Sequence, residues 1–132
     1  MAITDKELFP RGESGGKSVA GVTASGDNEG MIARIWRGWA PQTRADDYQR
    51  HYETDVSDHL KAVCGFRGAQ LLRRDEGTEV VFTSITWFTD LAAVRGFAGD
   101  DYELALVEDA GQAALSRWDE RVAHHEVAVQ VS

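Results

Sequence analysis

The alternation of apolar and polar residues becomes regular at Met31, and the first two elements can be read from it. Met31 to Trp39 is rich in aromatic and branched residues, which predicts a strand ended by Pro41. Thr43, with Asp46 three residues later, resembles a helix capping box. Apolar residues then recur at helical spacing until Gly65, which predicts one amphipathic helix whose inward residues are Tyr48, Tyr52, Val56, Leu60 and Val63.

A hairpin and a second helical region follow. Phe66 to Arg74 and Val80 to Phe88 flank the turn sequence Asp75-Glu76-Gly77, so we expect two antiparallel strands. Asp90 is placed to cap a helix that breaks at Gly99, and the pattern predicts further helical turns from Asp101 to about Trp118. A last strand is expected from Val122 to Val131.

This order of elements, βαββαβ, predicts an α+β fold of the ferredoxin-like type, in which helices cover one face of a four-stranded antiparallel sheet. The segment from Val80 to Phe88 carries large apolar residues at both parities, so both faces of the sheet are expected to be apolar. Helices on one side cannot cover both faces. We therefore expect a homodimer in which two sheets pack face to face.

Composition narrows the class of protein. The 132 residues, 42% of them apolar, suit one compact domain over residues 31–132, preceded by a glycine-rich extension over residues 1–30 that we interpret as flexible. A formal charge of −8 argues against nucleic acid or an anionic membrane as the partner. Without a membrane-length apolar run, a signal-like segment or a second cysteine beside Cys64, a cytoplasmic protein is expected.

Two neighbouring histidines near the C-terminus are the first candidates for chemistry. In a strand, His124 and His125 point to opposite faces. His125 shares its parity with Val127, Val129 and Val131, so alternation predicts that His125 is the buried one and a possible proton acceptor.

A second candidate group lies on the first helix. His51, Asp55 and His59 are spaced i, i+4, i+8, and imidazole with carboxylate suits zinc or iron. These positions also border the apolar stripe, where an amphipathic helix normally places polar residues. We interpret them as that polar border, and predict no metal and no cofactor.

At the level of longer segments, the chain resembles the antibiotic biosynthesis monooxygenase domain family, of dimeric α/β barrel fold. The resemblance rests on MIARIWRGW, GFRGAQLLRRDEGTEVVFTSITWF, DLAAVRGFAGDDYELALV and LSRWDERVAHHEV. It implies a homodimer with a pocket between sheet and helices, in which a deprotonated aromatic substrate reduces O₂ without a cofactor. In relatives the last strand often reads HYEV, which aligns His124 rather than His125 with the family histidine.

The resemblance therefore implies a cofactor-independent monooxygenase acting on a small aromatic molecule of the polyketide or anthrone type. A non-oxidative cyclase or isomerase of the same fold, or a small-ligand-binding dimer without catalysis, remains an alternative. The resemblance also extends to a branch of the superfamily that degrades haem with an asparagine on the first strand. In this sequence that position is Arg37, so haem degradation is disfavoured. The predicted catalytic residues are His124 and His125, and the predicted substrate-binding residues are Trp36, Arg37, Tyr52, Arg73, Trp87 and Tyr102.

Overall fold

The computed structural model describes residues 31–132; the predicted extension over residues 1–30 lies outside the described residues. Its sheet is antiparallel and has β3 (Glu79–Phe88) between β2 (Phe66–Asp75) and β1 (Ile32–Pro41). Two short strands, β4 (Arg117–Trp118) and β5 (Ala123–Glu126), pair one after the other with the free edge of β1. Together they fill the position of the predicted fourth strand, so the α+β plan is confirmed.

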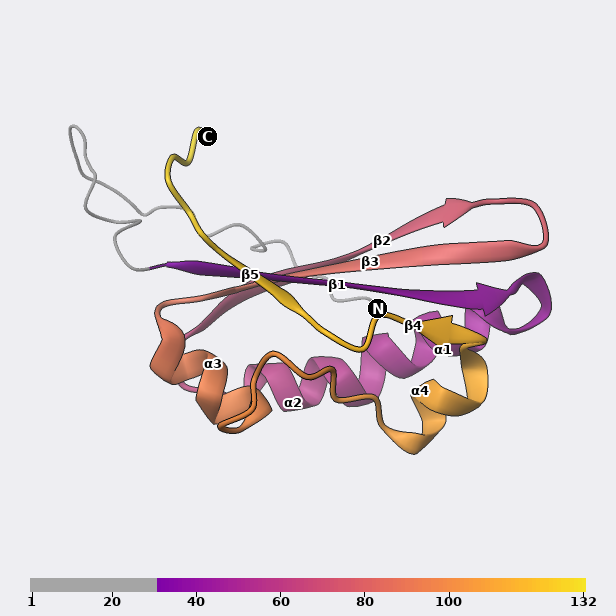
Figure 1. Cartoon of the computed structure of the whole chain (residues 1–132), viewed down its shortest axis with the longest axis horizontal. Coiled ribbons are helices and arrows are strands. Elements are labelled where there is room, and N and C mark those ends of the chain that lie inside the picture. The colour runs from indigo at the N-terminus through magenta and orange to yellow at the C-terminus, as the bar shows by residue number, and fades with distance from the viewer. Residues whose placement is uncertain (1–30) are drawn as a thin grey trace.

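The helices lie on one side of this sheet (Figure 1). After the short 3₁₀ turn η4 (Gln42–Arg44), a long helix runs through α1 (Ala45–His51), the π-helical turn η5 (Tyr52–Val56) and α2 (Ser57–Lys61). Two shorter helices follow β3, namely α3 (Leu91–Ala98) and α4 (Asp109–Ala114). No helix among residues 31–132 combines the length and apolar character needed to cross a membrane.

Two of the predicted local signals are confirmed and one is wrong. Asp90 caps α3, since its Oδ1 accepts a hydrogen bond from the Ala93 amide at 2.9 Å. Gly77 takes a positive φ of 88° in the β2–β3 turn. The predicted capping box is wrong: the N-cap of α1 is Arg44 without a side-chain cap, and Asp46 instead accepts a hydrogen bond from Arg73.

The C-terminal third departs most from the sequence pattern. Of the helical turns expected over Asp101 to Trp118, the structure contains only α4. Before α4 the backbone pairs with an extended segment instead: the Val122 amide donates to the Glu103 carbonyl and the Ala105 amide to the Glu120 carbonyl. These long-range bonds satisfy donors that a helix would otherwise use. The expected last strand is likewise shorter, because only Ala123–Glu126 pairs with β1.

The core lies between the sheet and the helices, and Phe82 and Phe88 of β3 are fully buried there. Because side chains alternate along a strand, Val81, Ile85 and Trp87 point to the opposite face. Within residues 31–132 no helix covers that second face (Figure 1). Both faces of the sheet are therefore apolar, as the sequence predicts.

Candidate functional site

A cavity of about 880 Å³ opens between the sheet and the helices. This volume is in the range of small-molecule binding sites. Its walls come from β1, β3, the long helix, α3 and the segment before α4. Most of the wall is apolar or aromatic, and the polar and charged side chains on it include Arg34, His51, His59, Ser84, Thr86 and Glu108.

Arg34 is a buried cation on this wall. Strand β1 turns its even-numbered residues toward the helices, and Arg34 keeps only 7% of its surface exposed. Its Nη1 donates to the Tyr102 carbonyl at 2.6 Å and to His124 Nε2 at 2.9 Å. Burial lowers the pKa of Arg34 from 12.5 to about 10, so it is still charged at neutral pH. Within residues 31–132 no carboxylate forms an ion pair with it.

His124 lies behind Arg34, away from the cavity. Because a guanidinium has no acceptor atom, His124 Nε2 must accept the hydrogen bond and Nδ1 must carry the ring proton. Nδ1 is buried and has no hydrogen-bond partner among the described residues. The ring also packs edge-on against Tyr102, at 5.2 Å between centroids. Burial first, and then the charge of Arg34, lowers the pKa of His124, so the imidazole is neutral at pH 7.

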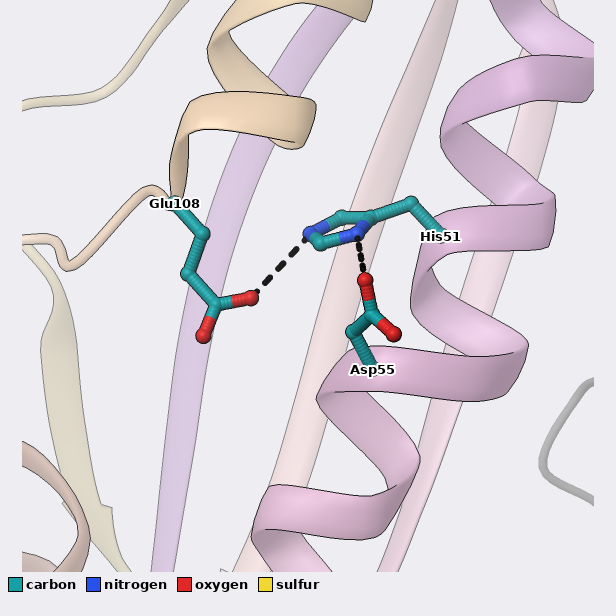
Figure 2. Close-up of side chains that lie close together, drawn as sticks. All are labelled: His51, Asp55 and Glu108. Carbon is teal, nitrogen blue, oxygen red and sulfur yellow. Dashed lines mark hydrogen bonds and ion pairs between the residues drawn. The ribbon is translucent and has the colours of Figure 1, made fainter.

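On the opposite wall, His51 stands between two carboxylates (Figure 2). Its Nδ1 is 3.1 Å from Asp55 Oδ2, one helical turn onward, and its Nε2 is 3.5 Å from Glu108 Oε1. The second Glu108 oxygen is 2.9 Å from His59 Nδ1. The His51 side chain is only 7% exposed, whereas those of Asp55 and His59 are largely exposed. The cluster thus runs from the cavity wall to the solvent.

Aromatic rings form much of the remaining wall. Tyr48 and Tyr52 project from the long helix, and burial raises the pKa of both phenols, so neither ionises near neutral pH. The Tyr52 hydroxyl lies 3.2 Å from Ser84 Oγ on β3. Trp36 donates its indole N–H to the Asp119 carbonyl at 2.7 Å, which fixes the ring against the cavity. The wall is therefore suited to a flat apolar molecule.

The structure brings only some of the predicted residues together. Trp36 and Tyr52 line the cavity as expected. His124 and Tyr102 lie one layer back, where both contact Arg34. Parity along the last strand predicts His125 as the buried histidine, and this is wrong. His125 pairs with Ala33, points to the face without helices and is exposed, because the valines after it lie beyond the end of β5.

The other predicted substrate-binding residues lie outside the cavity wall. Arg37 is exposed on the opposite face of β1 and pairs with Asp119 at 3.4 Å. Arg73 donates to Asp46 and Gln49 at the surface. Trp87 is on the face of β3 that the helices leave open. None of these three side chains lines this cavity, so their predicted contact with a substrate stays a prediction.

Two charged cavity residues, Arg34 and Glu108, are absent from the sequence-based predictions. The sequence pattern does indicate Arg34, because it has the same parity as Ile32 and Trp36 on the predicted strand and is the one charged residue on that side of the strand. No sequence pattern indicates Glu108, because it lies in a segment predicted to be helical and is far along the chain from His51. Its position depends on the irregular backbone before α4.

No family model matches the chain, and no curated protein matches it in sequence. Solved structures do resemble its fold. SnoaB, a cofactor-independent oxygenase from Streptomyces nogalater, is similar with a TM-score of 0.54 and 17% identity, over 76% of this chain and 95% of SnoaB. Rv0793 from Mycobacterium tuberculosis is similar with a TM-score of 0.52 and 17% identity, over 77% of this chain and 99% of that one. At this identity the likeness establishes the fold.

Proposed function

We propose that the protein is a cofactor-independent monooxygenase that oxidises an acidic aromatic molecule of the anthrone type with O₂. The observation that carries the proposal is Arg34, a buried cation on an aromatic cavity wall with no carboxylate partner among the described residues. Buried charges are normally paired. An anionic ligand in the cavity would supply the missing counter-charge, and the likeness of the fold to an oxygenase supports the reaction type.

The proposed chemistry needs few protein groups. Beside Arg34, a phenol or an acidic C–H group loses its proton more readily, because the guanidinium stabilises the resulting anion. The electron-rich anion then passes electrons to O₂. For an anthrone, the CH₂ carbon loses both hydrogens and gains one oxygen atom as a carbonyl, while the second oxygen atom leaves as water. The substrate supplies all the electrons, and the apolar wall limits side reactions with water.

In this proposal His124 is a positioning residue rather than the proton acceptor. Its Nε2 lone pair is occupied by Arg34, and the ring does not line the cavity. A neutral His124 holds the guanidinium toward the ligand, and the Tyr102 carbonyl fixes the same nitrogen from a second direction. The predicted catalytic role of a histidine thus becomes, in our proposal, an indirect one.

We also propose that the chain forms a homodimer through the open face of its sheet. Ile35 and Trp87 point to that face, and Leu72 on β2 is 46% exposed there. Apolar surface of this kind on a sheet favours association. Size-exclusion chromatography with light scattering tests this: a mass near twice 14.5 kDa supports the dimer, and a monomer at micromolar concentration contradicts it.

Oxygen-electrode measurements with dithranol test the oxidation, after correction for its spontaneous reaction. Arg34→Met should reduce protein-dependent uptake at least about 10-fold, because it removes a charged hydrogen-bond donor from the site. Arg37→Met is the matched control, since that residue lies on the same strand but faces away. No uptake above background with the wild type contradicts the oxidative proposal, and anaerobic turnover of dithranol would then favour the cyclase or isomerase reading.

A further inference from the structure

We propose that His51, His59 and Glu108 bind a divalent transition-metal ion at the solvent-exposed edge of the cavity, with Asp55 hydrogen-bonded behind His51. His51, Asp55 and Glu108 each offer a ligand atom within 4.8 Å of the others. His59 is not one of this group, but its Nδ1 lies 2.9 Å from the second oxygen of Glu108, so a rotation of its largely exposed side chain can add it as a ligand. This site goes beyond the proposed oxidation, which depends on Arg34 and on the electrons of the substrate.

The shape of the long helix brings the two histidines to one side. Over eight residues a regular α-helix turns by about 800°, which would leave His59 about 80° around the axis from His51. The π-helical turn η5, Tyr52–Val56, lies between them and takes up one additional residue. The remaining rotation is about 700°, within about 20° of two full turns. Single π-helical turns are frequent at functional sites.

The distance between His51 and Glu108 suits two ligands of one ion better than a direct hydrogen bond. His51 Nε2 and Glu108 Oε1 are 3.5 Å apart, beyond the usual N–H···O range of about 2.7–3.2 Å. Two atoms that each lie about 2.1 Å from a tetrahedral ion are about 3.4 Å from each other. Two imidazoles and a carboxylate form a nitrogen and oxygen donor set that suits zinc or ferrous iron, and three protein ligands would leave the fourth position of a tetrahedral ion for water or another ligand.

The surroundings of His51 fit the role of a ligand. Asp55 accepts the Nδ1–H hydrogen bond at 3.1 Å, which leaves the Nε2 lone pair directed toward Glu108 (Figure 2). A carboxylate behind a histidine ligand is the common arrangement in zinc proteins.

Direct metal titration tests the site. The full chain, produced without a polyhistidine tag and treated with a chelator, is titrated with Co²⁺ by visible absorption and with Zn²⁺ by calorimetry. We expect one ion per chain. Glu108→Gln and His59→Ala should weaken binding at least about 10-fold, because each removes one of three ligands. Asp55→Asn should weaken binding about 10- to 100-fold, because it removes the carboxylate that holds the His51 ring in place. His125→Ala is the matched control, since that histidine is exposed on the other face.

Two results would overturn the proposal. One is the absence of Co²⁺ and Zn²⁺ binding at about 100 μM ion. The other is binding that Glu108→Gln and His59→Ala leave unchanged, which would place the ion elsewhere on the chain. Both variants alter partly or largely exposed side chains, so folding is expected to survive, and circular dichroism checks it. The titration contains no aromatic ligand, so its failure says nothing about the proposed oxidation, and the reverse also holds.

Discussion

Replacing Arg34 with methionine should separate ligand binding from folding stability. The shift of the Arg34 pKa from 12.5 to about 10 corresponds to a cost of about 3 kcal/mol for keeping the charge buried. Two hydrogen bonds from the charged group, to Tyr102 and His124, each return about 1.5–3 kcal/mol. The cost of burying the charge and the gain from the two hydrogen bonds are therefore of similar size. We therefore expect Arg34→Met to change the free energy of unfolding by less than about 2 kcal/mol.

The same substitution should strongly weaken the binding of anions. A ligand anion against the guanidinium forms a charged hydrogen bond worth about 1.5–3 kcal/mol, so the dissociation constant should rise about 10- to 100-fold. Quenching of tryptophan fluorescence measures this constant, because Trp36 lines the cavity. A hydroxyanthraquinone titrated above and below the pKa of its phenol is the probe, and its methyl ether is the neutral reference.

The pattern of affinities is the decisive result. The wild type should prefer the ionised phenol to the methyl ether, and Arg34→Met should lose that preference while retaining its affinity for the ether. Equal affinity of wild type and variant for the ionised phenol, with both proteins shown to be folded by urea titration, would refute the proposal that the charge of Arg34 binds the anionic ligand.

Three further predictions concern stability. Gly65→Ala should lower the free energy of unfolding more than Gly77→Ala does. Both glycines have a positive φ, but only at Gly65 would a Cβ atom lie 2.6 Å from other side-chain atoms. Urea unfolding should show a difference between the two variants above about 1 kcal/mol. Asp90→Ala should cost about 1 kcal/mol in the same assay through loss of the α3 cap, and a cost near zero would contradict that role. The pKa of His124 is lower in the folded chain than in the unfolded chain, so the unfolded chain binds the proton first as the pH falls. The neutral His124 therefore contributes fully to stability above about pH 6.5, and this contribution is lost as the pH falls toward the lower folded-state pKa. Melting temperatures from pH 7.5 to 5 should therefore fall less steeply in His124→Gln than in wild type, and equal slopes in the two proteins would contradict this role.

Much of the fold could be predicted because its signals are local. The period of apolar residues and the glycines at turns define β1, the long helix and the β2–β3 hairpin with small errors at their ends. The segment from Asp101 to Trp118 lacks such a signal in its first half, where backbone bonds to residues far along the chain decide its path. Helical spacing alone therefore overstates its helix content.

The site was harder to predict, because it depends on pairing between distant segments. Which of His124 and His125 faces the helices is decided by the register of β5 on β1, and not by the apolar residues that follow them. Arg34 gains its importance from the absence of a carboxylate partner among residues 31–132, which only the folded structure reveals. Glu108 reaches His51 through tertiary structure alone.

The position of Arg34 inside an acidic protein has a kinetic consequence. The chain carries a formal charge of −8, so an approaching anion is repelled before it meets the buried Arg34 guanidinium that attracts it. Dissolved salt screens the distant repulsion, with a Debye length of about 8 Å at physiological ionic strength, but hardly reaches the buried contact. Added salt should therefore speed association and leave dissociation nearly unchanged, and ligands with one delocalised negative charge should enter faster than those with several.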